Sequence, residues 1–319
     1  MSKIKTKYNT ALVTGGAGFI GSHLVARLLH EGLRVVSLDD YSSGKDDNLA
    51  HLEDNTNLSI EKCDVTDYEK LEKIFAKYQF DVVFHNAASK KNICLKDPKR
   101  DLEVNGAGTY NILHLSREHG VKKVVHASTG SVYGEAQYFP QDESHPLVPL
   151  SFYGVSKLAG EKYCKMFSEV FGLDTTVLRY FHVYGPNQES DDDLGGVVAI
   201  FKKRVSKGLP LIIHGDGTQQ RSFTHVDDVV GINLFVAETE GTKGEAYNCA
   251  SGVNVTINEL AQAFRNRYNQ DIKILHDEWL TGDIKVFDVD NSKLTDMGFE
   301  FNISFTDGLA DLLDLPDAS

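Results

Sequence analysis

The chain has 319 residues, of which 41% are hydrophobic and 25% are charged, a balance typical of a folded globular protein. Its formal net charge of −13 and the scarcity of clustered Lys and Arg argue against a general nucleic-acid binder. The polar N-terminal segment MSKIKTKYNT and the lack of a long apolar run predict a protein that is neither secreted nor membrane-spanning.

Short β-branched runs alternate with helical patterns through the first 180 residues. The runs cover 11–14, 34–39, 81–85, 122–127 and 175–180. This rhythm predicts an α/β protein with a Rossmann-type parallel sheet and helices on both faces. Within it, Thr66 and Glu69 have the spacing of a capping box ahead of an apolar helix face.

The alternation weakens after about residue 185. There the chain has an acidic, Gly-rich stretch (ESDDDLGG) typical of a solvated loop, a hairpin-like segment at 209–223, and a helical pattern from Ile257. We expect residues 1–181, with a return segment at about 226–251, to form a dinucleotide-binding domain. Residues 182–225 and 252–319 would form a smaller mixed α/β substrate-binding lobe.

The segment TGGAGFIGSH directly follows the first predicted strand and precedes an amphipathic helical pattern. Glycines at this place allow a tight turn, so that the N-terminus of the helix can approach a pyrophosphate. A glycine-rich turn without a ligand is the alternative interpretation. The context of strand, loop and helix favours the dinucleotide.

Asp39 and Asp40 end the second predicted strand, at about the separation from the glycines expected for an acid that binds a ribose diol. An acid there repels a 2′-phosphate, so NAD is favoured over NADP. Two surface aspartates in a turn would be the alternative, and the glycine loop makes that alternative weaker.

Tyr153 and Lys157 lie four residues apart in a helical pattern, so their side chains share one helix face. A lysine held there would lower the tyrosine pKa and make the phenol a usable acid and base. Tyr41 and Lys45 have the same spacing, but YSSGK is unlike a regular helix. Only the first pair follows a strand whose end carries Ser128 and Thr129, where open α/β sheets bind ligands.

From about residue 10 to 300 the chain resembles the extended short-chain dehydrogenase/reductase family, and within it the nucleotide-sugar epimerases and dehydratases such as UDP-glucose 4-epimerases. The resemblance is carried, in order, by TGGAGFIGSH, LDDYSSG, CDVTD, HNAAS, STGSVYGE, YGVSK, LRYFHVYGPNQ and GDGTQQRSFTHVDDV. It implies NAD as cofactor, a nucleotide-sugar substrate, most simply a UDP-sugar, and a homodimer formed by the segments around 98–119 and 152–171.

The resemblance also implies roles for single residues. Tyr153 would be the acid/base, Lys157 would orient the nicotinamide ribose, and Thr129 would bridge the tyrosine and the sugar hydroxyl. Substrate contacts would come from Thr129, Ser131, His182 and Arg221. The cofactor, besides touching Tyr153 and Lys157, would be held by Gly15, Gly18, Phe19, Ile20, Gly21, Asp39, Asp40, Ser43, Gly44, Asp64, Val65, Ala87, Ala88, Lys90, Asn105, Tyr180 and Phe181.

The expected chemistry removes a hydroxyl proton through Tyr153 while a hydride leaves for NAD⁺, which gives a transient 4-keto sugar. Dehydratases of this family place an ionisable pair directly after the catalytic threonine. Here those positions hold Gly130 and Ser131, which do not ionise usefully near neutral pH. The sequence therefore favours a 4-epimerase over a 4,6-dehydratase or a decarboxylase.

Two positions depart from the family pattern. His182 stands where relatives often have asparagine, and Leu280 stands where a second arginine for the diphosphate is expected. For His182, an unusual sugar or altered stereochemistry is an open interpretation. For Leu280, the open interpretations are a weaker grip on the diphosphate, compensation by Lys202 or Lys203, and a non-nucleotide substrate. A 4,6-dehydratase, a 4-dehydrogenase that releases NADH, and a non-catalytic NAD(H)-binding sensor or scaffold stay as alternatives.

The four cysteines are far apart and form no C-x-x-C pair, so neither a metal site nor a disulfide framework is predicted. Their pattern fits a reducing compartment, and we expect the protein in the cytoplasm.

Overall fold

The computed structural model describes residues 3–89, 91–190, 195–268, 271–279 and 285–314. At its centre is a seven-stranded parallel sheet in the order β11-β6-β5-β4-β1-β2-β3. Its strands are β1 (Thr10–Thr14), β2 (Arg34–Asp39), β3 (Leu58–Lys62), β4 (Val82–His85), β5 (Lys123–Thr129), β6 (Thr175–Tyr180) and β11 (Glu245–Cys249). The predicted α/β fold is confirmed.

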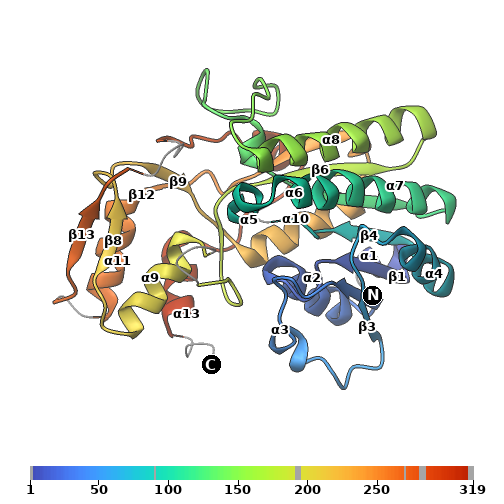
Figure 1. The fold of residues 1–319 in the computed structure, drawn as a ribbon, viewed down its shortest axis with the longest axis horizontal. Coiled ribbons are helices and arrows are strands. Elements are labelled where there is room, and N and C mark those ends of the chain that lie inside the picture. Colours follow the sequence, from blue (N-terminus) through green and yellow to red (C-terminus); the bar gives the residue numbers. More distant parts are fainter. Residues whose placement is uncertain (1–2, 90, 191–194, 269–270, 280–284, 315–319) are drawn as a thin grey trace.

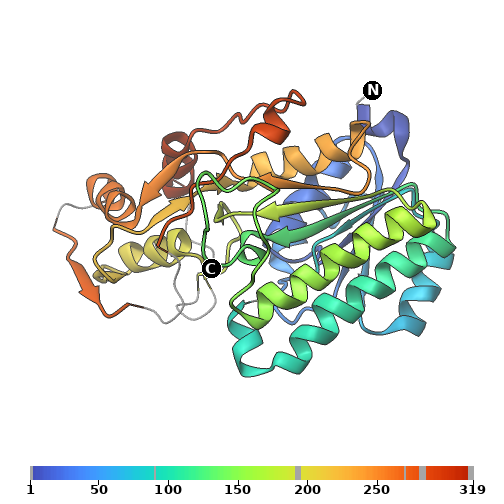
Figure 2. The same cartoon turned by 90° about the horizontal axis from the view of Figure 1, so that it is seen from above.

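Helices cover both faces of this sheet, which is why its central strands are buried almost throughout. One face packs on α2 (Phe19–His30), α10 (Val226–Glu238) and the short α1 (Lys3–Lys7). The other face packs on α4 (Tyr68–Tyr78), α7 (Thr109–Glu118) and α8 (Phe152–Phe171). Figure 2 shows α7 and α8 side by side on the outside of the molecule.

A second lobe, on the left in Figure 1, has its own apolar core. It contains α9 (Val197–Ser206), α11 (Ile257–Tyr268), α13 (Phe305–Asp314) and the strands β8 (Leu211–His214), β9 (Gln220–Ser222), β12 (Asn254–Thr256) and β13 (Ile274–Asp277). Between the lobes the chain forms β7 (Val183–Tyr184), which pairs with β10 (Thr224–His225). The short helices α3 (Asp47–Ala50), α5 (Lys91–Lys96), α6 (Pro98–Asp101) and α12 (Ser292–Thr295) complete the described elements outside the η segments.

The hairpin expected at 209–223 is wrong. Its first strand, β8, pairs in parallel with β13, and its second, β9, pairs antiparallel with β12. Gly215 and Gly217, both with positive φ, redirect the chain between them, and the Gly217 carbonyl accepts the Asn258 amide at 3.0 Å at the start of α11. The loop therefore ties two elements of the lobe together instead of closing a two-stranded ribbon. The helix expected from Ile257 is present.

The capping box expected at Thr66 is also displaced by one residue. The N-cap of α4 is Asp67, whose carboxylate accepts the Lys70 amide at 3.1 Å. Thr66 instead donates its amide and its hydroxyl to the Asp64 carboxylate, each at 2.8 Å. Thr66 thus closes an Asx turn at Asp64, just after β3, instead of capping α4.

Candidate active site

The glycine loop lies between the end of β1 and the start of α2. Gly15 has φ +67°, and a Cβ there would lie 2.9 Å from the backbone nitrogen of Ala87. A Cβ on Gly21 would lie 2.9 Å from the Gly16 Cα, so both close approaches require glycine. No side chain caps α2 at Gly18. Its first backbone N–H groups are therefore available to an anion such as a pyrophosphate, which is the fit that a dinucleotide needs.

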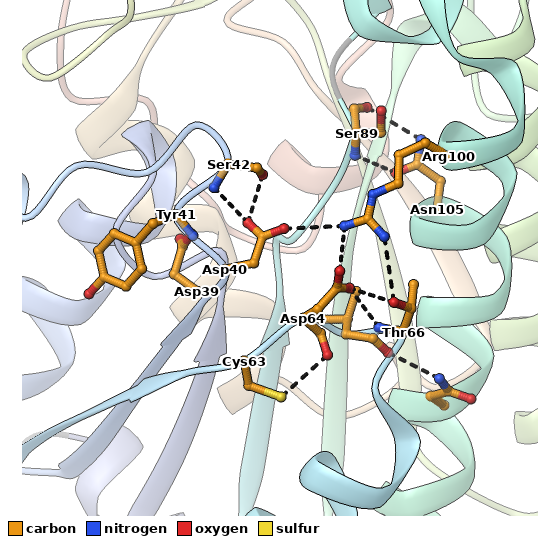
Figure 3. Close-up of polar contacts among 12 residues, drawn as sticks. Asp39, Asp40, Tyr41, Ser42, Cys63, Asp64, Thr66, Ser89, Arg100 and Asn105 are labelled. Carbon is orange, nitrogen blue, oxygen red and sulfur yellow. Dashed lines mark hydrogen bonds and ion pairs between the residues drawn. The ribbon is translucent and has the colours of Figure 1, made fainter.

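The two aspartates at the end of β2, Asp39 and Asp40, have different hydrogen-bond partners. Asp39 is 7% exposed, and its carboxylate accepts the Ala17 amide at 3.0 Å and the Tyr41 amide at 2.8 Å. Burial raises the pKa of Asp39, and these backbone donors offset part of that effect. Asp39 thus fixes the glycine loop and the following turn. Asp40 binds Ser42 with one oxygen and directs the other to Arg100 (Figure 3).

A cavity of about 320 Å³ opens at the carboxyl ends of the central strands. Ligands of open α/β sheets bind at this edge. Of the residues that the sequence assigned to the cofactor, the following line the cavity: Gly15, Gly18, Phe19, Ile20, Gly21, Asp39, Asp40, Ser43, Gly44, Asp64, Val65, Ala87, Ala88, Tyr153, Lys157 and Tyr180. The structure therefore brings most of the predicted set together from the ends of five strands of the sheet and from helix α8.

Two of the described residues predicted for the cofactor do not line this cavity. Asn105 is fully buried behind it, and Phe181 is 2% exposed beneath it. Lys90 lies outside the described residues. The four predicted substrate residues also lie off the cavity wall: Thr129 and Ser131 at η2 (Gly130–Val132), His182 on the chain that leads into the second lobe, and Arg221 on β9 within that lobe.

The sequence reasoning missed several residues of the cavity wall. Asn86 and Ser89 follow β4, so the rule that ligands bind at strand ends could have found both, while Ser128, already placed near the end of a strand by the sequence, also lines the cavity. Arg100 comes from α6 and carries no local signal of its own. Further lining residues are Leu38, Ser42, Lys45, Asn48, Cys63, Ile93, Val104, Ala127, Asn187 and Glu189.

Tyr153 and Lys157 project from the first two turns of α8. Ser151 caps this helix by accepting the Gly154 amide at 3.1 Å, and Gly154 must be small because a Cβ would lie 2.7 Å from the Ser131 carbonyl oxygen. The helix start is thereby held against η2. Tyr41 and Lys45, which share the spacing, lie in a non-helical turn with Tyr41 at φ +63°, as expected.

Burial dominates the electrostatics of this pair. It raises the pKa of Tyr153 to about 12, while a hydrogen bond with Thr129 acts in the opposite direction. Burial lowers the pKa of Lys157 to about 8, with nearby acidic groups such as Glu161 opposing the change. Lys157 is not among the groups that shift the pKa of Tyr153, so the expected lowering of the tyrosine pKa by Lys157 is not found in the protein alone.

A buried network of hydrogen bonds around Asn105 contacts the helix that carries Tyr153 and Lys157. Asn105 lies on η1 (Leu102–Gly108), a π-helical segment that the sequence did not predict. Its amide donates to Asp101 at 2.7 Å and to the Ser156 hydroxyl at 3.0 Å, and its carbonyl accepts the Ser89 amide at 2.9 Å. Ser156 donates in turn to the Tyr153 carbonyl at 3.0 Å. These bonds join the wall of the cavity to the catalytic helix.

A buried ion pair fixes α8 to the sheet. Arg179 on β6 binds Glu161 with two hydrogen bonds of 3.1 and 2.8 Å, and the two side chains are 5% and 6% exposed. Ser128 donates to the same carboxylate at 2.5 Å. Arg179 also donates to the Tyr133 hydroxyl at 2.7 Å. Because the charges and their hydrogen bonds are satisfied together, this network can be tolerated in the core.

The residues after Thr129 leave little room for another side chain. The Thr129 hydroxyl accepts the Ser131 amide at 3.1 Å and starts η2. A Cβ on Gly130 would lie 2.7 and 2.8 Å from ring atoms of Phe181. The Phe181 ring is itself stacked on Tyr133, with ring centroids 6.1 Å apart.

His182 and Arg221 both lie near the ring of Phe287. The His182 ring lies 4.8 Å from the Phe287 ring, and the Arg221 guanidinium lies 5.5 Å from the same ring. Arg221 is 7% exposed on β9 and donates to the Gln220 carbonyl at 2.9 Å. Arg221 is therefore not an exposed surface side chain. Leu280 lies outside the described residues.

Residues 11–250 match the NAD dependent epimerase/dehydratase family. The chain belongs to this family. It is 37% identical to a UDP-glucose 4-epimerase of Mycolicibacterium smegmatis, over 94% of this chain and 96% of the relative. The structure matches a UDP-glucose 4-epimerase of Thermotoga maritima crystallised with UDP-glucose, with a TM-score of 0.90, 37% identity, and coverage of 96% of this chain and 97% of the other.

Other branches of the epimerase/dehydratase family are similar as well. A dTDP-glucose 4,6-dehydratase of Streptomyces venezuelae with NAD bound has a TM-score of 0.87 and 29% identity, with 95% of each chain covered. The cofactor of the family is NAD, in agreement with the glycine loop and the acids at the end of β2. Among the described residues, no helix combines the length and the apolar character needed to cross a bilayer.

Proposed function

We propose that this member of the family is an NAD-dependent nucleotide-sugar 4-epimerase. The observation that carries the proposal is the packing at Gly130, where the Phe181 ring occupies the space that an ionisable side chain would need. Elimination of water requires a second acid and base near the sugar, and Ser131 cannot supply one near neutral pH. Oxidation and re-reduction at one carbon need only the groups that are present.

In the proposed mechanism the glycine loop and Asp39 to Gly44 hold the dinucleotide, and Lys157 hydrogen-bonds its nicotinamide ribose. NAD, when bound, accepts the hydride from C4 and returns it. Tyr153 takes the C4 hydroxyl proton, with Thr129 as its hydrogen-bond partner, and returns the proton to O4 when the hydride adds to the other face of C4. The sugar must turn between the two steps.

The buried environment gives Tyr153 and Lys157 complementary proton affinities. A phenol with a pKa near 12 is a poor base by itself, so the proposal requires a positive charge beside it in the working complex. The oxidised nicotinamide ring carries such a charge, as does protonated Lys157. Bound, oxidised cofactor would therefore add to the effect of protonated Lys157 and favour the tyrosinate further.

We further propose UDP-sugars as the substrate class, with Arg221 as the cation on the diphosphate. The support is the burial of Arg221 and the similarity to proteins named as UDP-sugar epimerases. A forked guanidinium suits a diphosphate. In this assignment residues 1–181 and about 226–251 carry the cofactor, and residues 182–225 and 252–319 carry the nucleotide-sugar.

Homodimer formation through α7 and α8 is part of the proposal. Leu113 and Leu115 pack into the core of the subunit, whereas Leu102, Met166 and Val170 are 60%, 45% and 64% exposed. The exposed set also contains Tyr110 on α7 and Val155 and Tyr163 on α8, and Leu102 lies on η1 directly before α7. Apolar surface of this extent on adjacent helices favours burial against a second copy. The four free buried cysteines agree with the expected cytoplasmic location.

The test is product analysis with a panel of UDP-, dTDP-, GDP- and CDP-sugars, with and without added NAD⁺. We expect NMR to detect a C4 epimer without net NADH absorbance. A 4-keto-6-deoxy sugar would identify a dehydratase, and accumulating NADH a dehydrogenase. Binding of NAD without turnover of any sugar would favour the sensor or scaffold.

A further inference from the structure

Arg100 is a cation in the part of the cofactor cavity that is lined by Asp40 and Asp64. Its Nη2 lies 3.2 Å from Asp40 Oδ2 and 2.5 Å from Asp64 Oδ2, and its Nη1 lies 3.5 Å from the Thr66 hydroxyl (Figure 3). All three charged side chains line the cavity and are only 28–30% exposed. One guanidinium thus bridges two carboxylates that come from the ends of two neighbouring strands.

The backbone around Arg100 is firmly placed. Asp97 caps α6 by accepting the Arg100 amide at 3.0 Å, and Pro98 follows at the first helical position. The next residue, Asp101, is 1% exposed and belongs to the Asn105 network beneath the catalytic helix. Arg100 therefore cannot be regarded as a loose surface side chain that happens to meet two acids.

The carboxylates differ in how firmly they hold the guanidinium. Asp64 is locked, because its second oxygen accepts two hydrogen bonds from Thr66. Partial burial raises the pKa of Asp64, but these bonds and Arg100 together hold it below its ordinary value. Asp40 makes the longer contact, and its other oxygen is fixed by Ser42. Removing the charge of Asp40 would leave Arg100 anchored by Asp64 beside the vacated carboxylate position.

We propose that Arg100 can bind the 2′-phosphate of an adenosine ribose, but that the Asp40 carboxylate occupies this position on the guanidinium. Asp40 thereby keeps the protein selective for NAD over NADP. The inference rests on the proposed contact of Asp40 with the adenosine ribose. With Asp40 charged, a 2′-phosphate meets a carboxylate in front of the cation and is repelled. With Asp40 neutral, the phosphate takes the place of the carboxylate on a guanidinium whose forked geometry suits it.

Lys45 is the rival cation in the same cavity. Its ammonium lies 3.2 Å from the Glu189 carboxylate, and the side chain is 58% exposed. A single, well-hydrated ammonium on a flexible chain is a weaker and less directional phosphate ligand than a braced guanidinium. The structure thus ranks Arg100 first, and the two cations can be separated by mutation.

The experiment compares the full-length wild-type protein with Asp40→Asn, Asp40→Asn/Arg100→Gln and Asp40→Asn/Lys45→Gln. Calorimetry with 5′-AMP and 2′,5′-ADP isolates the adenosine end, and NADH and NADPH fluorescence titrations test the whole cofactor. We expect Asp40→Asn to strengthen 2′,5′-ADP binding relative to 5′-AMP by about 10- to 100-fold, the worth of one or two charged hydrogen bonds. In the Asp40→Asn background, Arg100→Gln should abolish that gain, whereas Lys45→Gln should leave most of it.

The inference would be overturned if the gain in 2′,5′-ADP binding persisted in Asp40→Asn/Arg100→Gln. It would also be overturned if the gain were lost in Asp40→Asn/Lys45→Gln. So would an Asp40→Asn variant that binds 5′-AMP more weakly yet gains nothing for 2′,5′-ADP, although the ribose assignment would then stand. If Asp40→Asn changes neither ligand, the ribose assignment itself fails. Arg100→Lys in the Asp40→Asn background keeps the charge without the fork, and we expect it to retain only part of the gain. Thermal unfolding of each variant checks that the fold is intact.

Discussion

Enlarging Gly130 by one methyl group should destabilise the protein through Phe181. In Gly130→Ala the new Cβ would lie 2.7 and 2.8 Å from two ring carbons of Phe181. The ring has little freedom to retreat, because it is 2% exposed and packs against the rings of Tyr133 and Phe287, each with a centroid separation of 6.1 Å. Overpacking of this kind costs about 1–3 kcal/mol.

Denaturant titration and thermal unfolding measure this cost. Each kcal/mol corresponds to about 2–4 °C in the melting temperature of a chain of 150–250 residues, and to slightly less in a longer chain. Gly231→Ala is the matched control, because its Cβ would meet the Phe299 ring at 3.5 Å, an ordinary contact, in the middle of α10. We expect that control to be neutral or to gain about 0.5–1 kcal/mol from helix propensity.

A double-mutant cycle identifies Phe181 as the cause. Phe181→Leu removes the ring atoms that the methyl group would meet. Gly130→Ala should therefore cost less in the Phe181→Leu background, with a coupling of about 0.5–3 kcal/mol. A Gly130→Ala variant as stable as the wild type, or strictly additive effects, would refute the reasoning. The proposal that no ionisable group fits at this position would then lose its basis.

Three other predictions concern the catalytic helix. Tyr153→Phe should lower kcat by about 10²- to 10⁴-fold while NAD still binds; steady-state kinetics and an NADH titration check this, and unimpaired turnover would remove Tyr153 from the mechanism. NAD affinity should fall as pH rises through about 8, because Lys157 is protonated below that pKa and loses its ribose-binding charge above it; a titration at pH 6.5–9.5 tests this, and a flat profile contradicts it. Arg179→Met should cost about 3–5 kcal/mol by leaving Glu161 buried without its cation, and Arg179→Met/Glu161→Leu should recover part of the loss in urea titrations. A single variant of unchanged stability would show that the pair contributes little.

The sequence predicted those features whose signals are local. The glycine loop, the acids that end β2 and the Tyr153–Lys157 helix each depend on residues close in the chain, and the structure puts them around one cavity. Tyr41 and Lys45, which have the same spacing, could be rejected as a catalytic pair from local sequence as well, because the Ser and Gly residues between them oppose a helix.

The features that the sequence did not predict depend on competition or on distant contacts. Thr66 could cap a helix or close the turn at Asp64, and only the packed structure decides between them. The bridge from Arg100 to Asp40 and Asp64 joins segments that are 60 and 36 residues apart. The high pKa of Tyr153 follows from burial, which spacing on a helix does not reveal.

The central claim, reversible oxidation at C4 with the hydride returned to the same carbon, is tested most directly with a nucleotide-sugar deuterated at C4. The enzyme should be incubated with the labelled substrate identified by the panel, and the product analysed by NMR and mass spectrometry. We predict a C4 epimer that keeps its deuterium at C4, with no label in solvent. Deuterium at C6 of a 4-keto-6-deoxy product, or in NADH that accumulates, would contradict the epimerase account.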